Sequence, residues 1–199
     1  TAVGNDALLS NTTASNNTAV GYQAGYSNTT GAGITALGAY AAQDHTTGAE
    51  FTAIGYFSGS DNTTGAQNTT VGAGSLRFNT TGSYNSVLGW QALHNNTTAS
   101  FNTAVGYHAL YANTTGARNT AVGYNALDAF TGSGTAENTA IGFETGGGLT
   151  SGTFNTFVGG QAALATTTGS NNVALGNSAL AANTTASQNV ALGYQASYA

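Results

Sequence analysis

The chain has 199 residues and a mass of 19.7 kDa; 40% of its residues are hydrophobic, only 5% are charged, and the formal net charge is −5. A typical globular domain is about a quarter charged. With two Arg and no Lys the chain lacks a basic surface for phosphates, so we expect no nucleic-acid binding. The absence of Cys excludes disulfides, thiolate metal sites and Cys nucleophiles.

Hydrophobic residues occur in short groups along the chain. No apolar run approaches the roughly 20 residues that a membrane-spanning helix needs, so we expect no membrane insertion by this segment. The chain begins at Thr1 within a repeat pattern, without Met or a signal peptide. We therefore expect a mature segment or a fragment of a longer protein.

An internal repeat runs along the whole chain. Its most regular feature is a Gly that follows a branched aliphatic residue, and we call these glycines the anchors. Every interval between anchors is 17 residues except one of 19, between Gly123 and Gly142, where residues 132–136 hold two extra residues. The preceding residues, which we call the aliphatic column, are Val3, Val20, Leu37, Ile54, Val71, Leu88, Val105, Val122, Ile141, Val158, Leu175 and Leu192.

Other positions of the repeat are also constrained. Thr, Ser or Val lies two residues before the aliphatic residue, and side chains alternate in a strand, so both positions share one face. Because the aliphatic column is apolar in every repeat, we expect this face to point into the core. A small residue such as Ala24 or Ala92 follows the anchor by three positions, and a polar N-T-T-G turn comes next.

Seventeen residues are too few for a helix pair, which needs about 33 per repeat. The pattern predicts an all-β, single-domain parallel β-solenoid (β-roll) of about twelve coils, with two short strands of 4 or 5 residues per coil. Gly and Asn suit its corners because both tolerate positive φ. We expect residues 1–199 to form one rod on the order of 55 Å long, at about 4.8 Å per coil. Such a rod is typical of a segment of a longer or end-to-end stacked fibre.

Two repeats also carry a recognisable motif. Residues 172–176 and 189–193 resemble the N-x-V-A-I-G signature of the YadA-like head of trimeric autotransporter adhesins, and residues 102–106 carry a Thr variant of it. The arrays are also similar to repeats in phage and viral fibre proteins. The resemblance implies a left-handed parallel β-roll, association into trimers, and exposure on a cell or virion surface. The period of 17 is slightly longer than that head's usual repeat.

Two sets of Asn recur in register. One column, the Asn ladder, is expected to hydrogen-bond along the rod axis as stacked amides do, with direct ligand binding as the alternative. It contains Asn17, Asn68, Asn85, Asn102, Asn119, Asn138, Asn155, Asn172 and Asn189. The other set begins the N-T-T turns, which match the glycosylation sequon, although Asn and Thr are also good turn residues. These possible glycosylation sites are Asn11, Asn28, Asn62, Asn79, Asn96, Asn113 and Asn183.

An aromatic residue often follows the anchor directly, and these rings form the aromatic column. Its members are Tyr22, Tyr56, Trp90, Tyr107, Tyr124, Phe143 and Tyr194. From Trp90 to Phe143 four successive repeats carry a ring, so we expect these rings to stack. Their parity matches that of the aliphatic column, which favours packing in the interior; if exposed, the rings could hold sugars or a neighbouring chain.

The few charged residues are placed singly. Arg118 and Glu137 share a column in adjacent coils. We therefore expect an ion pair along the rod axis that contributes little to stability if it is exposed. Asp44 and Asp61 also share a column and are a weak candidate for a cation such as Ca²⁺. The three His residues, His45, His94 and His108, fall in different columns. We therefore expect surface or turn positions for them and no metal cluster.

Catalysis finds no support, because the repeat register places no His and acid beside any Ser or Thr hydroxyl. We expect no enzyme activity and no cofactor. The leading interpretation is a structural extracellular fibre or surface adhesin segment that self-associates as a trimer or end to end. The alternative is the receptor- or glycan-binding part of a phage or viral tail fibre, or a sugar- or matrix-binding adhesin, with the irregular stretch 128–157 as its candidate patch. A minor alternative is ice binding, since regular Thr ladders can match ice spacing.

Overall fold

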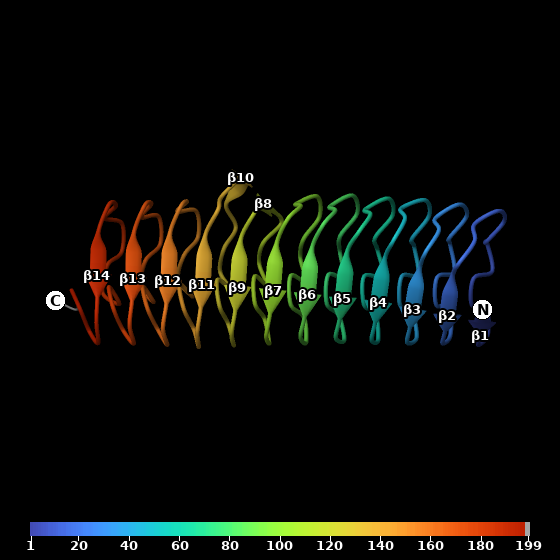
Figure 1. Cartoon of the computed structure of the whole chain (residues 1–199), viewed down its shortest axis with the longest axis horizontal. Coiled ribbons are helices and arrows are strands. Elements are labelled where there is room, and N and C mark those ends of the chain that lie inside the picture. Colours follow the sequence, from blue (N-terminus) through green and yellow to red (C-terminus); the bar gives the residue numbers. More distant parts are fainter. Residues whose placement is uncertain (198–199) are drawn as a thin grey trace.

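The chain forms a parallel β-solenoid in the computed structural model, which describes residues 1–197. Coils stack along one long axis from the N-terminal to the C-terminal end, and each contributes a strand to one face (Figure 1). Twelve of these strands form a single parallel sheet in sequence order. The predicted fold class is thereby confirmed. Within residues 1–197 there is no helix, and so none long and apolar enough to cross a membrane.

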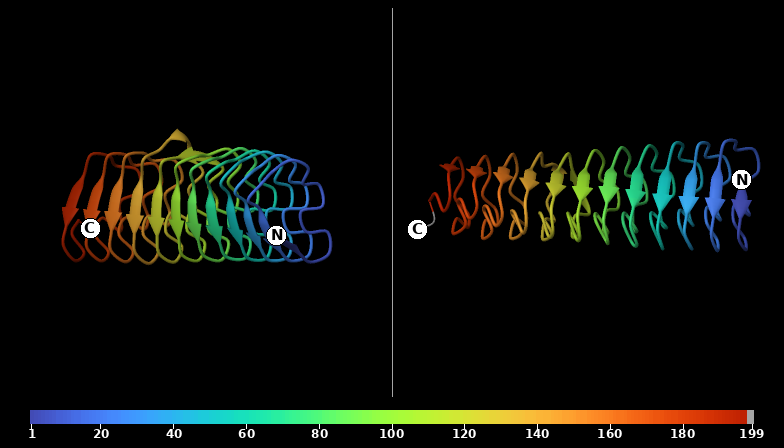
Figure 2. Two further views of the ribbon diagram at one scale, coloured as in Figure 1. Left: turned by 45° about the vertical axis from the view of Figure 1, so that its right-hand side comes forward. Right: turned by 60° about the horizontal axis from the view of Figure 1, so that its bottom comes forward.

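The strands of the large sheet are short and evenly spaced (Figure 2). They are β1 (Ala2–Val3), β2 (Thr18–Val20), β3 (Thr35–Leu37), β4 (Thr52–Ile54), β5 (Thr69–Val71), β6 (Ser86–Leu88), β7 (Thr103–Val105), β9 (Thr120–Val122), β11 (Thr139–Ile141), β12 (Thr156–Val158), β13 (Val173–Leu175) and β14 (Val190–Leu192). Residues one repeat apart are paired, as Thr18 is with Thr35 and Ala19 with Ala36. The sequence repeat and the coil are therefore the same unit.

The two extra residues of the longer repeat leave the coil without disturbing this register. Thr139 of β11 still pairs with Thr120 of β9. The insertion forms β10 (Ser133–Thr135), which pairs in parallel with β8 (Thr115–Ala117) of the preceding coil as a separate two-stranded sheet. Figure 1 shows this pair at the corner of the rod opposite the tips of the main strands.

Most coils contain one strand of three residues, so the prediction of two strands of 4 or 5 residues per coil is wrong. After the anchor the chain turns through alternate left-handed residues, such as Gln91 (φ 51°) and Leu93 (φ 49°). This conformation is unfavourable for residues with a Cβ atom. It is held by hydrogen bonds between coils, in which Gln91 N donates to Ala73 O (3.0 Å) and Leu93 N to Ala109 O (2.9 Å).

The core combines Ala side chains from the strands with, in several coils, Leu side chains from the turns. The middle residue of each strand points inward, so that Ala104 and Ala121 are fully buried, as is Ala109 three residues after an anchor. The aliphatic column instead faces outward; Leu88, for example, is 50% exposed. The expectation that this column fills the core is therefore wrong. Most strands contribute Ala to the core, and the larger buried residues come from the turn after the anchor, where Leu76, Leu93 and Leu110 are fully buried.

Two of the buried Phe rings lie where a Gly makes room for them. A Cβ atom added to Gly59 would overlap the ring of Phe51, and one added to Gly146 would crowd the ring of Phe157. Both rings are fully buried. Volume is thus conserved between facing positions, as close packing requires.

The anchor glycines are explained by conformation and by close approach. Gly106 has a φ of 131°, which side-chain-bearing residues rarely adopt. A Cβ atom at this position would overlap the carbonyl group of Gly123 in the next coil. The anchors therefore let neighbouring coils approach backbone to backbone.

Candidate binding surface

The Asn ladder is an internal hydrogen-bond system. Asn102 is 1% exposed, and its Oδ1 accepts hydrogen bonds from the backbone N (2.9 Å) and Nδ2 (3.3 Å) of Asn119. The same pair of bonds links Asn68 to Asn85, with donor–acceptor distances of 2.8 and 3.0 Å. These amides point away from solvent, so the ladder offers nothing to a ligand. Within the column, Ile34 and Phe51 take the place of Asn in two coils.

The Asn residues of the N-T-T turns form a second ladder that sequence reasoning missed. Asn96 Nδ2 donates to Asn79 Oδ1 (2.7 Å), and Asn113 Nδ2 donates to Asn96 Oδ1 (3.3 Å). Five residues of this set are fully buried: Asn28, Asn62, Asn79, Asn96 and Asn113. A glycan on these amide nitrogens is incompatible with the folded coils. The buried amides leave no space for a sugar, and the sugar would replace an Nδ2 hydrogen that the ladder uses for hydrogen bonding. Only Asn11 and Asn183, in the end regions of the rod, are partly exposed.

The two ladders meet at one backbone carbonyl in each of several coils. Asn85 Nδ2 and Asn96 Nδ2 both donate to Ala99 O, each at 3.0 Å. Where the second ladder has Thr166 in place of Asn, Asn155 Nδ2 alone donates to the equivalent Gly169 O, at 2.9 Å. Buried carbonyl groups need such partners. The ladders therefore satisfy the backbone of the turn as well as each other.

His45 occupies an Asn position of the second ladder, so it lies in a turn as one of the two expected alternatives has it, but it is fully buried and not on the surface. Its Nε2 donates to Gly48 O (2.6 Å) and its Nδ1 accepts from Asn62 Nδ2 (2.8 Å). This pattern requires the neutral ring, and burial lowers the pKa of His45. Because His45 donates elsewhere, the buried Oδ1 of Asn28 has no hydrogen-bond partner.

The outer face of the large sheet carries the aliphatic column along its whole described length. Its exposed members include Val20 (38%), Leu88 (50%), Leu175 (51%) and Leu192 (63%). The Thr column of the same strands also faces outward, because it has the same parity. Charged residues are absent from both columns. A continuous apolar stripe on an isolated chain is typical of an interaction surface.

The aromatic column runs beside this stripe and is also exposed, which contradicts the preference for interior packing. Trp90, Tyr107, Tyr124 and Phe143 are 45, 40, 44 and 52% exposed. The stacking prediction is confirmed, because the centroids of successive rings lie 4.9, 5.1 and 5.3 Å apart with interplanar angles of 10 to 15°. The residue after the anchor lies where the chain leaves the sheet, and it therefore points away from the core.

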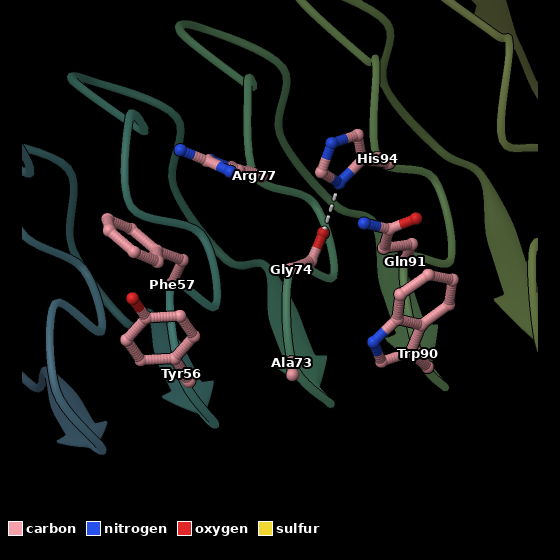
Figure 3. Close-up of a pocket in the computed structure, with 8 residues that line it drawn as sticks. All are labelled: Tyr56, Phe57, Ala73, Gly74, Arg77, Trp90, Gln91 and His94. Carbon is pink, nitrogen blue, oxygen red and sulfur yellow. Dashed lines mark hydrogen bonds between the residues drawn. The ribbon is translucent and has the colours of Figure 1, made fainter.

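One hollow interrupts the aromatic column, and we call it the notch. It is lined by Tyr56, Phe57, Ala73, Gly74, Arg77, Trp90, Gln91 and His94. Figure 3 shows Tyr56 and Phe57 on one side, Trp90 and Gln91 on the other, and Ala73 and Gly74 as the floor between them. His94 Nδ1 donates to Gly74 O at 2.6 Å and so ties the floor to the next coil. Sequence reasoning placed the irregular patch at 128–157 and missed this one.

The charged residues form no metal centre. Asp44 and Asp61 lie in adjacent coils, and burial, with a smaller contribution from Asp61, raises the pKa of Asp44. Within residues 1–197 no group of three or more His, Cys, Asp or Glu side chains could hold a metal ion. Arg118 Nη1 lies 3.1 Å from Glu137 Oε1, which confirms the predicted axial ion pair. Both side chains are about half exposed, so the pair adds little to stability.

Comparison with known proteins finds no family model, no curated protein and no solved structure that matches this chain. The resemblance to the YadA-like head repeat therefore rests on the sequence motif alone.

Proposed function

We propose that this chain is a non-catalytic structural segment of an extracellular fibre or surface adhesin, in which copies associate side by side. The observation that carries the proposal is the exposure of the aliphatic column on one face of the rod, in register from coil to coil. Stable interfaces take roughly 20–30 residues from each partner. The aliphatic column and the Thr column of the same outer face have twelve members each and together supply 24.

A second copy of the chain is the partner that fits this face best. The column repeats at the coil spacing, so only a surface with the same spacing can contact every coil in the same way. A second rod has that spacing by construction. With no charged residue in the column, association does not bury an unpaired charge. The resemblance to trimeric adhesin heads favours three copies.

The proposal is tested by light scattering coupled to size-exclusion chromatography on the 199-residue chain and on the double variant Leu88→Lys, Leu175→Lys. We expect a discrete oligomer near three times 19.7 kDa for the unchanged chain and a folded monomer for the variant. Because both leucines are half exposed, their replacement should cost the single chain little stability. The control is Thr81→Lys, in an exposed turn away from the sheet. A monomeric unchanged chain, or an open polymer that grows with concentration, would contradict side-by-side association.

A second candidate function is glycan or receptor binding, and the exposed stack from Trp90 to Phe143 favours it. Aromatic side chains exposed on a surface are common platforms for ligands with an apolar side. In a fibre this role is compatible with the structural one, because the two columns can serve different partners along one rod.

A further inference from the structure

The notch exists because one coil lacks a ring that its neighbours have. Ala73 and Gly74 stand where the preceding coil has Tyr56 and Phe57. A comparable Ala, Ala39, leaves no such gap, because Tyr40 follows it. The ring of Tyr40 stacks on that of Phe57, with centroids 4.6 Å apart and an interplanar angle of 7°. At Ala73 neither position supplies a ring.

The width of the notch suits a single ring of a ligand. Tyr56 and Trp90 belong to coils two steps apart, which corresponds to about 9.6 Å at the usual spacing of about 4.8 Å between strands. A flat ring in contact with both walls at about 3.5 Å would use about 7 Å of this distance. A puckered pyranose is thicker because hydrogen atoms project from both of its faces. The spacing of the coils therefore leaves room for one sugar ring between the two side chains.

The polar groups of the notch are mainly hydrogen-bond donors. The Arg77 guanidinium lies over Phe57, with its carbon 4.5 Å from the ring centroid, and forms no ion pair within residues 1–197. Its buried Nε has no hydrogen-bond partner there either, so the two outer guanidinium nitrogens are the donors that a ligand can reach. Gln91 Oε1 accepts from His108 Nε2 (3.0 Å), and this bond leaves the Gln91 amide nitrogen facing the notch (Figure 3). A ligand that brings acceptors would match these groups.

Charge narrows the class of ligand further. The chain has only two basic residues, and Arg77 is the one in the notch. The acid of the preceding coil, Asp61, accepts a hydrogen bond from Ser60 and does not pair with Arg77. A guanidinium in a partly apolar setting binds carboxylates with two parallel hydrogen bonds. The carboxylate of a ligand would satisfy Arg77 in a way that a hydroxyl group cannot.

We propose that the notch between Tyr56 and Trp90 binds a carboxylated pyranose of an acidic glycan, with the sugar ring between the aromatic walls and its carboxylate at Arg77. This inference rests on the glycan-binding candidate of the preceding section and names its site and ligand class. The structural role of the rod does not depend on it.

Trp90 is the only Trp in the chain, so its fluorescence reports on this wall alone. The experiment titrates the 199-residue chain with trigalacturonic acid, or with neutral maltotriose, and follows Trp90 emission and binding heat in parallel. We expect a saturable change in emission with trigalacturonic acid. Ala73→Tyr adds a ring that the column accepts elsewhere and should weaken binding at least tenfold by filling the notch. Asn177→Tyr adds the same ring in the same column far from the notch and should leave binding unchanged.

Arg77→Gln tests the carboxylate contact. It should weaken binding of trigalacturonic acid at least tenfold while leaving any weak binding of maltotriose unchanged. Equal affinity for the two sugars would overturn the acidic specificity. Binding heat that persists in Ala73→Tyr would overturn the notch as the site and leave glycan binding elsewhere on the column in place. No binding heat with either sugar would overturn both. Light scattering on the same samples shows separately whether the rods still associate.

Discussion

Replacing Asn155 by Ala should destabilise the protein more than the same replacement at Asn85, although both residues are buried and make the same kinds of hydrogen bond. Asn85 Nδ2 donates to Asn68 Oδ1 and to Ala99 O, and Asn85 Oδ1 accepts from the backbone N of the next ladder residue. Asn155 repeats this set, and the equivalent carbonyl is Gly169 O.

The magnitude follows from the groups that each change leaves without a partner. Both variants leave one buried backbone N–H without its acceptor, at a cost of about 1–3 kcal/mol. Ala99 O keeps a bond from Asn96 after Asn85 is lost, whereas Gly169 O loses its side-chain donor because Thr166 stands in place of the second Asn. We therefore expect Asn155→Ala to cost about 1–2 kcal/mol more than Asn85→Ala.

Urea unfolding followed by circular dichroism measures this difference. If both variants show the same dependence of unfolding free energy on urea concentration, the difference between their unfolding midpoints gives the difference in stability directly. This comparison does not depend on how cooperatively the repeats unfold. The prediction would be refuted by equal losses, or by a greater loss for Asn85→Ala. Either result would mean that the two ladders do not share the turn carbonyl as a common acceptor.

Two further predictions concern residues that break or define the repeat. Burial lowers the pKa of His45, whereas the unfolded chain protonates it near pH 6.5, so the contribution of His45 to stability should fall as the pH drops below 6.5, by at most about 1.4 kcal/mol per pH unit. His45→Asn should reduce this slope in urea titrations at pH 7 and pH 5; an unchanged slope would show that His45 does not carry it. Gly106→Ala should cost more than about 3 kcal/mol, because it adds overlap with Gly123 to an unfavourable φ. Gly193→Ala, at an anchor with a φ of 119° and no atom within 4 Å of the added Cβ, should cost only the conformational part, and equal losses would rule out the overlap.

The repeat made the solenoid predictable, because a period of 17 residues, regular anchors and turn residues are all local signals. Which face of each strand points into the core was not predictable in the same way. In a Thr-Ala-Val strand such as β7, each face of the strand carries an apolar residue, Ala104 on one and Val105 on the other. The larger of the two is the expected core residue. The structure buries Ala104 and exposes the flanking face. The larger core residue of this coil comes from the turn instead, where Leu110 is fully buried in the same cluster as Ala104.

The candidate site was predictable only in part. The stack from Trp90 to Phe143 follows from the register alone, since equal positions in successive coils must lie above one another. Its exposure depends on the direction of the chain after the anchor, where Gln91 and its equivalents are left-handed. Conformational preferences argue against a left-handed backbone at residues with a Cβ atom, so nothing in the sequence indicated these positions. The notch could have been found in the sequence as the one place where Ala and Gly follow an anchor directly and both neighbouring repeats carry rings.

The longer coil shows where this architecture tolerates growth. The two added residues enlarge the perimeter of one coil at β10, while the pitch of the stack stays the same on both sides. Additions at that corner extend sideways from the rod and do not change its length. Foreign peptides grafted into β10 would therefore be displayed laterally, and the number of coils on either side would set their height along the rod.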